Sequence, residues 1–238
     1  MCGARNPKPK AAPAPPKHVC SAKGRRGRPV AKKPIIYLYP SAQCEATVRL
    51  ALTARGAQLG PLLPAPASAP LRGAAATWRV AAQPDGTLQP LGGGPPVASL
   101  FWEATGVAPA AALLPRGARD CHCVPGASAG AWLLGALRAQ GLSTREYTEC
   151  ATFWAPDMAR HAFVVVRLVP QAQWEALAPL AVEGLPPAAP TRTLRVFVAW
   201  RGVPAYLPGA DLGALPAAPP PARSASENWV VEWGGQEC

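Results

Sequence analysis

The stretch GLSTREYTECATFWAPDMARHAFVVVRL, residues 141–168, carries the clearest structural signals in the chain. Ser143 and Glu146 have the spacing of a capping box, in which the hydroxyl accepts a helix N–H and the glutamate accepts the N–H of the capping residue. Gly141 suits the end of a preceding helix, where a positive φ is needed. A helix is therefore expected to end before Gly141, and a second one to begin after Ser143.

The extent of these elements follows from the neighbouring residues. Pro156 disfavours helix at the residue before it, so the second helix is expected to end near Trp154. Residues 127–140 (ASAGAWLLGALRAQ) repeat apolar positions at three- and four-residue spacing, which predicts the first helix. Residues 162–168 (AFVVVRL) are aliphatic, largely β-branched and of strand length. The sequence thus predicts a central helix pair followed by a strand.

Short strands are predicted on the N-terminal side of this pair. Residues 35–39 (IIYLY) are β-branched and aromatic, residues 45–52 alternate apolar and polar, and residues 97–104 (VASLFWEA) form another apolar run. Pro84-Asp85-Gly86 lies between two short runs and predicts a tight hairpin. Residues 53–75 are rich in Ala, Pro and Gly, and we expect them to form an inserted loop.

The C-terminal side continues the same mixture. Residues 171–177 predict a short helix, residues 193–200 (TLRVFVAW) and 229–233 predict strands, and residues 204–226 predict a second Pro/Ala loop. The total is about seven strands and two or three helices, with hairpins early in the chain. This order predicts an α+β fold with a mainly antiparallel sheet and a central helix pair. We expect one such domain over residues 33–238.

Residues 1–32 are expected to form a disordered, basic tail. They are rich in Pro, Ala and Gly and nearly lack bulky apolar side chains, so they cannot bury enough surface to offset the entropy of ordering. Ten of the 24 Lys and Arg lie in residues 1–33, which contain no Asp or Glu. The rest of the chain then has 14 basic residues against 13 acidic ones, so any contact with DNA or another polyanion is expected at the tail.

Within the tail, Arg26-Gly27-Arg28-Pro29 resembles an AT-hook. In that motif an extended Arg-Gly-Arg lies in the narrow minor groove of A·T-rich DNA, where the negative potential is strongest. Flanking basic residues, namely Lys23, Arg25, Lys32 and Lys33, would contact phosphates. A plain solvated tail and a targeting segment are the alternatives. A transit peptide would also be Arg-rich and free of acids, although this tail is poor in Ser and rich in Pro.

Four motifs follow one another in the body: KPIIYLYP at 33–40, PDGTL at 84–88, LFWEA at 100–104 and VVEWGG at 230–235. In this order they resemble a family of uncharacterised bacterial proteins with a KPxIYLYP opening, an LFWE motif and a VVEWGG ending. The resemblance spans about residues 33–238. It implies no particular reaction, and the Ala/Pro expansions look specific to this chain.

The seven cysteines are expected to be reduced thiols, because their number is odd and nothing indicates secretion. Cys121-His122-Cys123 suggests a metal site completed by Cys150 or His161, but the spacing lacks a CxxC pair. Two small buried thiols are the simpler interpretation. A nucleophile pair of Cys150 or Cys123 with His161 is the corresponding catalytic alternative, and a buried core thiol is again simpler. The sequence predicts no bound metal and no cofactor.

Two glutamates beside tryptophans are the remaining candidates. Glu103 follows Trp102, and Glu232 precedes Trp233. If the two carboxyl groups approached each other, they could serve as acid and base, as in a glycosidase. The alternative is that each faces solvent or pairs with an arginine, such as Arg79, Arg167 or Arg195. The eight tryptophans are expected mainly in the core.

These observations leave two classes of function. The first is a binding or interaction module with a polycationic tail that contacts DNA. The second is a hydrolase that uses Glu103 and Glu232, or His161. No apolar run reaches about 18 residues and no signal-peptide core is present, so we expect no transmembrane segment and favour an intracellular location.

Overall fold

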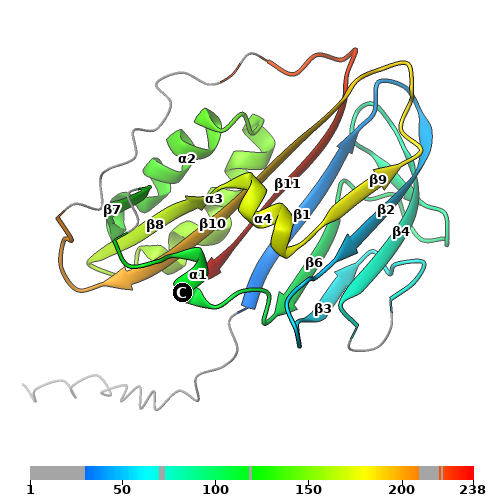
Figure 1. Cartoon of the computed structure of the whole chain (residues 1–238). Helices are drawn as coiled ribbons and strands as arrows, with labels where there is room; N and C mark the ends of the chain where they lie inside the picture. Colours follow the sequence, from blue (N-terminus) through cyan, green and yellow to red (C-terminus); the bar gives the residue numbers. More distant parts are fainter. Residues whose placement is uncertain (1–29, 70–72, 118–119, 209–219, 221) are drawn as a thin grey trace, which may run out of the picture.

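The structure of the chain is a computed structural model, which describes residues 30–69, 73–117, 120–208, 220 and 222–238 (Figure 1). The elements, in chain order, are β1 Val30–Tyr39, β2 Cys44–Ala51, β3 Gln58–Leu63, β4 Ala75–Ala82, β5 Leu88–Pro90, β6 Leu100–Thr105, α1 Ala110–Leu113, β7 Cys121–Pro125, the 3-10 turn η1 Gly126–Ser128, α2 Ala129–Ala139, α3 Thr144–Met158, β8 Phe163–Val169, α4 Gln171–Leu177, β9 Leu180–Glu183, β10 Thr191–Val203 and β11 Asn228–Glu237.

The strands form two sheets. The large sheet has the order β3-β6-β1-β11-β10-β8-β7, and the small sheet has the order β5-β4-β2-β9. Among the described strands every pairing is antiparallel except that of β10 with β11. The predicted α+β class and the mainly antiparallel pairing are therefore confirmed. The consecutive strands β1 and β2 lie in different sheets, since β2 pairs with β4 and β9 rather than with β1.

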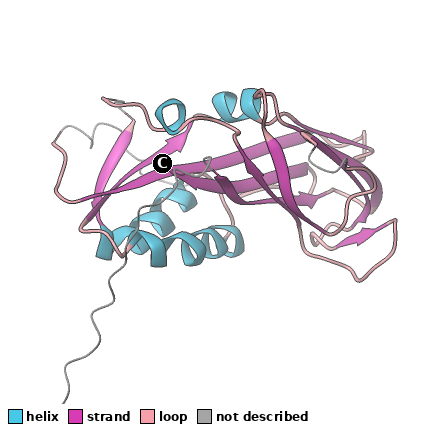
Figure 2. Cartoon of the chain, turned by 90° about the horizontal axis from the view of Figure 1, so that it is seen from below, coloured by secondary structure: helices cyan, strands magenta, loops and turns pink. Residues whose placement is uncertain are grey.

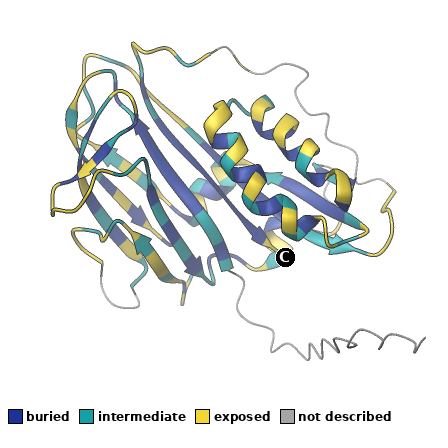
Figure 3. Ribbon diagram, turned by 180° about the vertical axis from the view of Figure 1, so that it is seen from behind, coloured by how far each residue is buried: buried dark blue, intermediate teal, exposed yellow. Residues whose placement is uncertain are grey.

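Two hydrophobic cores lie on opposite faces of the large sheet. One core is enclosed between the large and small sheets and includes Trp78 and Phe197. The other lies between the large sheet and the helices α2 and α3, and includes Trp154 and Trp200. Helices are accordingly seen on both sides of the large sheet (Figure 2). The faces of α2 and α3 that point to the sheet are buried, and their outer faces are exposed (Figure 3).

The burial of each strand follows from this layering. β2 alternates between buried and exposed residues, because only one face of the small sheet is covered. In contrast β1, β10 and β11 contain long runs of consecutive buried residues, because the large sheet is covered on both faces in its middle. Alternation of apolar and polar residues therefore indicates a strand of the small sheet, and a continuous apolar run indicates a strand in the middle of the large sheet.

The motifs of the family resemblance come together around β1. Ile36 pairs with Glu232 of the VVEWGG segment on one side and with Leu100 of the LFWEA segment on the other. The turn of PDGTL reaches the same strand, since a Cβ atom on Gly86 (φ +88°) would lie 2.7 Å from Cε1 of Tyr39. Segments that are far apart in the sequence thus form one continuous structural unit.

The predicted end of the second helix is wrong, because α3 continues through Pro156 to Met158. Met158 and Trp154 are fully buried against the large sheet, so packing favours another helical turn. Proline removes only one N–H, and the helix ends soon after it. The capping box of Ser143 and Glu146 at the other end of α3 is confirmed.

Two further local predictions have different outcomes. The hairpin is confirmed, because β4 pairs with β5 around Gly86 and the side chain of Asp85 accepts a hydrogen bond of 2.8 Å from the N–H of Thr87. The loop over residues 53–75 is not uniform, since β3 forms within it and pairs with β6 at the edge of the large sheet. An edge position tolerates Gly60 and Pro61, which the composition alone had assigned to a loop.

The boundary of the basic tail also needs correction, because β1 begins at Val30. Lys33 has a φ of +52°, and its ammonium lies 4.7 Å from the ring centroid of Phe153 and 5.6 Å from that of Trp233. These contacts hold Lys33 in the folded body rather than among the phosphate-contacting residues. The predictions for residues 1–29 concern residues outside the described ranges.

Deleting residues 1–29 is expected to leave the melting temperature within a few degrees of that of the full chain, because no described packing is removed. Deleting residues 1–34 is expected to lower it by several degrees more, since Ala31 is fully buried and Lys33 is lost. Thermal unfolding of the three chains by circular dichroism measures the difference. Equal melting temperatures for the two deletions would contradict the assignment of residues 30–34 to the fold.

None of the helices in the described part of the chain combines the length and the apolar character needed to cross a bilayer.

Candidate functional site

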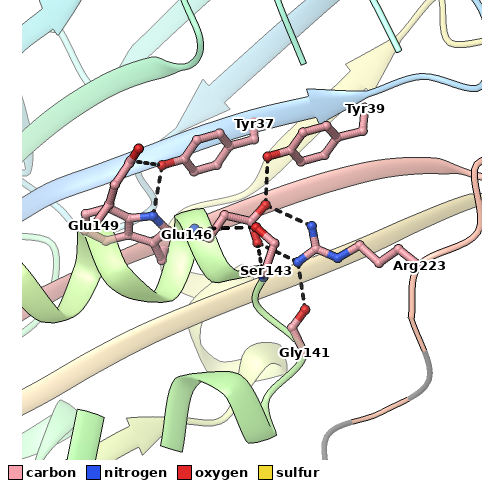
Figure 4. Close-up of polar contacts among 8 residues, drawn as sticks. Tyr37, Tyr39, Gly141, Ser143, Glu146, Glu149 and Arg223 are labelled. Atoms are coloured by element: carbon pink, nitrogen blue, oxygen red, sulfur yellow. Dashed lines mark hydrogen bonds and ion pairs between the residues drawn. The ribbon is translucent and has the colours of Figure 1, made fainter. Parts of the chain in front are cut away.

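Two polar clusters lie on opposite faces of the paired strands β1 and β11. The Tyr–Glu cluster consists of Tyr37, Tyr39, Glu146, Glu149 and Arg223 and lies on the side of α3 (Figure 4). The buried cluster consists of Glu232, Arg195, Trp102 and Trp174 and lies between the two sheets. Each cluster joins residues that are far apart in the sequence.

Regular spacing builds the Tyr–Glu cluster. Tyr37 and Tyr39 are two residues apart on β1 and therefore share one face, and their rings are stacked with centroids 6.2 Å apart. Glu146 and Glu149 are three residues apart on α3 and share the face towards the sheet. Two parallel hydrogen bonds result: Tyr37 donates to Glu149 over 2.5 Å, and Tyr39 donates to Glu146 over 2.9 Å.

Arg223 joins this cluster from the coil that precedes β11. Its guanidinium donates to both carboxylate oxygens of Glu146, over 2.8 and 2.7 Å, and to the carbonyl oxygen of Gly141 over 2.8 Å. The guanidinium carbon lies 5.3 Å from the ring centroid of Trp229 and 5.9 Å from that of Tyr39. Arg223 is thus surrounded by a carboxylate, a carbonyl and two aromatic rings.

The environment determines the protonation of these groups. Burial by itself would raise the pKa of Glu146, but the hydrogen bonds and charge of Arg223, together with donors from Ser143 and Tyr39, hold that pKa below its usual value. Burial raises the pKa of Tyr39 well above its usual value, and the neighbouring carboxylate of Glu146 raises it further. Glu146 is therefore an anion, and Tyr39 is a neutral donor.

Two clefts meet at Arg223, and together we call them the trough. One has a volume of about 270 Å³ and is lined by Tyr39, Trp229 and Ser143 among others. The second has a volume of about 360 Å³ and extends past Ser143 towards Tyr147. Both clefts have Ser143 and Arg223 in their walls. The trough therefore runs past the start of α3 with the Arg223 side chain at its middle.

The buried cluster is organised around one carboxylate. Glu232 accepts hydrogen bonds from the indole nitrogens of Trp102 (2.9 Å) and Trp174 (2.8 Å) and from Nε of Arg195 (2.8 Å). The side chains of Glu232 and Arg195 are each 1% exposed, and Arg195 also donates to the carbonyl oxygen of Ala178. This arrangement ties β11, β6, α4 and β10 together. Its paired charges and buried position suit structural support.

The proposed carboxylate pair is not brought together. Glu232 faces the core between the sheets, whereas Glu103 is adjacent to Trp102 in β6 and so faces the opposite side. Glu103 instead accepts a hydrogen bond of 3.4 Å from the backbone N–H of Lys33. Glu232 pairs with Arg195, as the alternative interpretation anticipated. Since a sheet separates the two carboxyl groups, they cannot act on one bond.

His161 lies away from both glutamates. Its ring centroid is 5.9 Å from that of Trp200, and its imidazole covers Gly202, where a Cβ atom would overlap the ring. The absence of a side chain at Gly202 thus makes room for the imidazole. The three proposed catalytic residues belong to three separate environments.

The proposed metal ligands also point in different directions. Cys121 and Cys123 contribute to the core between the sheets, whereas the His122 ring lies 5.1 Å from that of Trp132 on the other side of β7. Cys150 belongs to the core under α2 and α3, and burial raises the pKa of its thiol. Among the described residues no three His, Cys, Asp or Glu side chains are grouped to hold a metal ion.

The AT-hook-like motif, which consists of Arg26, Gly27, Arg28 and Pro29, lies outside the described ranges.

The sequence analysis did not predict the Tyr–Glu cluster, although the two-residue spacing in IYLY and the three-residue spacing of Glu146 and Glu149 indicated one polar face on each element. The participation of Arg223 had no sequence signal, because it is a single arginine in a Pro/Ala-rich segment.

Comparisons with protein-family models, with curated proteins and with solved structures return no match for this chain.

Proposed function

We propose that the protein is a binding module whose body takes a ligand in the trough and whose basic N-terminal segment contacts DNA or another polyanion. The observation that carries this proposal is the distribution of charge. Residues 1–29, which precede β1, hold eight basic and no acidic residues, whereas seven ion pairs join charged side chains within the described body. Attraction to a polyanion is thereby concentrated at one end of the chain.

The trough supports the binding half of the proposal. It combines the aromatic faces of Tyr39 and Trp229 with polar groups of Ser143 and Arg223, and aromatic rings with a few fixed polar groups are typical of ligand sites. The α2–α3 pair would serve as its platform, because the turn between these helices supplies Gly141 and Ser143. We also propose membership of the family with the KPxIYLYP and VVEWGG motifs. Tyr39 and Pro40 of the first motif and Pro84 of the PDGTL segment line this trough.

The DNA contact makes a specific prediction. The full chain is expected to bind A·T-rich duplex more tightly than G·C-rich duplex, because Arg26 and Arg28 would enter the narrow minor groove. If about six phosphates are neutralised, the affinity is expected to fall roughly 10³-fold between 50 and 200 mM salt, because counterions are released. Fluorescence-anisotropy titration of both duplexes at both salt concentrations measures these effects.

Matched substitutions distinguish contacts in the minor groove from contacts with phosphates. Replacing Arg26 and Arg28 together by Ala is expected to remove the preference for A·T. Replacing Lys23 and Arg25 by Ala removes the same amount of charge and is expected to weaken binding to both duplexes alike. Lys33 is unsuitable for this control, since it packs inside the body. Equal affinity of the unmodified chain for the two duplexes would reduce the segment to a non-specific polycation.

A further inference from the structure

The surroundings of Arg223 are a complete receptor for a guanidinium group, and they come from four separate parts of the fold. Glu146 of α3 supplies a carboxylate that is fully buried, and Gly141 supplies a carbonyl oxygen. Tyr39 of β1 and Trp229 of β11 supply the two rings. A planar cation with several N–H donors matches a bidentate carboxylate and aromatic faces better than an ammonium does.

This receptor is held in place by contacts other than those of Arg223. One carboxylate oxygen of Glu146 accepts a hydrogen bond from Tyr39 over 2.9 Å, and the other accepts the backbone N–H of Ser143 over 2.8 Å. Both donors are neutral, so the charge of the carboxylate is not balanced by them. A buried carboxylate without a cation is strongly unfavourable, so the site requires a cationic occupant.

The present occupant is attached to the fold by a coil. In the part of the chain that the structure describes, no helix or strand lies between Val203 and Asn228, and Ala222 and residues 224–226 are exposed. The guanidinium group connects this coil to the site through its hydrogen bonds to Glu146 and Gly141. Arg223 lines both clefts of the trough, whereas the fully buried Glu146 lines neither, so the carboxylate becomes accessible from the clefts only when the Arg223 side chain leaves it.

We propose that this is an arginine-binding site for an extended peptide of a partner protein, and that Arg223 occupies it as an internal ligand which the partner's arginine displaces. The inference rests on the proposed role of the trough as the ligand site of the body. The two clefts would accommodate the residues that flank the bound arginine. A tethered competitor weakens the apparent affinity for an external one, so removing it should strengthen binding.

The test uses the full chain and a fluorescein-labelled peptide with the sequence PPPARSAS, which corresponds to residues 219–226. Two further peptides carry lysine or citrulline in place of the arginine. We expect Arg223→Ala to bind the arginine peptide on the order of tenfold more tightly than the unmodified chain does. We expect a similar preference of this variant for arginine over lysine and over citrulline. Fluorescence anisotropy measures all of these affinities.

Three further variants show whether the vacated Glu146 carboxylate is what binds the peptide. Adding Glu146→Gln to Arg223→Ala is expected to abolish the preference for arginine, and glutamine keeps the capping box with Ser143. Arg49→Ala removes another arginine that pairs with a glutamate, Glu183, and neither residue lines the two clefts, so this variant is expected to leave peptide affinity unchanged. If Arg223→Ala does not fold, Arg223→Gln replaces it, because glutamine retains hydrogen bonding to Glu146 without the charge.

The outcomes separate the inference from the proposed function. Equal binding of the three peptides to the Arg223→Ala chain would overturn the arginine site and leave the trough as a peptide site. No binding of any peptide would overturn both the arginine site and the trough as its ligand surface. Replacing Arg25, Arg26 and Arg28 by Ala in the Arg223→Ala chain tests the chain's own tail. A further gain in peptide affinity would show that the tail takes the site and would overturn the assignment to a partner.

Discussion

Replacing Glu232 by Ala is expected to lower the free energy of unfolding by about 3–5 kcal/mol, because it leaves the guanidinium of Arg195 buried without its counter-charge. The same change removes the acceptor of the indole N–H groups of Trp102 and Trp174. Urea denaturation followed by tryptophan fluorescence, with linear extrapolation to water, measures the loss.

Glu103→Ala is the matched control, since Glu103 also neighbours a tryptophan but is only partly buried and accepts a hydrogen bond of 3.4 Å from the backbone N–H of Lys33. It is expected to change the free energy of unfolding by less than about 1 kcal/mol. Combining Glu232→Leu with Arg195→Met is expected to cost less than the sum of the two single changes, because no charge is left buried alone. Equal losses for Glu232→Ala and Glu103→Ala would contradict the structural role of the buried cluster.

Replacing Gly126 by Ala is expected to cost about 3 kcal/mol or more, because a Cβ atom there would overlap the backbone carbonyl oxygen of His161 and lie 2.8 Å from that of Met158. Backbone atoms at the end of α3 cannot move aside as a flexible side chain can. For a chain of this size the melting temperature should fall by roughly 6–12 °C. Thermal unfolding by circular dichroism measures it.

Gly135→Ala is the same substitution nine residues later, in the middle of α2, where a Cβ atom would meet nothing within 4 Å. It is expected to raise stability by about 0.5–1 kcal/mol, because alanine has the higher helix propensity. A loss of stability at Gly135 as large as that at Gly126 would show that the close approach of the His161 carbonyl is not the cause.

Structural features that depend only on neighbouring residues were predicted correctly. The capping box of Ser143 and Glu146, the positive φ at Gly141 and the hairpin at Gly86 are all present in the structure. Each depends on hydrogen bonds or backbone conformation within a few residues. Such interactions have the same geometry in any fold that contains them.

Predictions from a breaker residue or from composition alone were less successful. Pro156 was expected to end α3, but the burial of Met158 extends the helix beyond it. Residues 53–75 were expected to form a loop, but pairing with β6 makes β3 a strand. In both places a contact with a distant element outweighs a local preference, and no local pattern reports the strength of that contact.

The candidate sites show the same division. The sequence marked Glu103 and Glu232 as costly acids beside tryptophans, and Glu232 does have the arginine partner that the alternative interpretation expected. The sequence did not show that a sheet separates Glu103 from Glu232. The trough and its Arg223 were missed altogether, because they arise where β1, α3 and the coil before β11 meet.

The sequence by itself thus determined the α+β class, the starts of the main helices and the separation of a basic end from a nearly neutral body, since these follow from local hydrogen bonding, periodicity and composition. Only the tertiary structure decided the division into two sheets, the closed environment of Glu232 and the receptor around Arg223. Packing of α3 against the large sheet brings Glu146 within reach of Tyr39, which is 107 residues away. Contacts at that separation depend on which elements of the fold become neighbours. The pattern of residues within one element does not determine its neighbours.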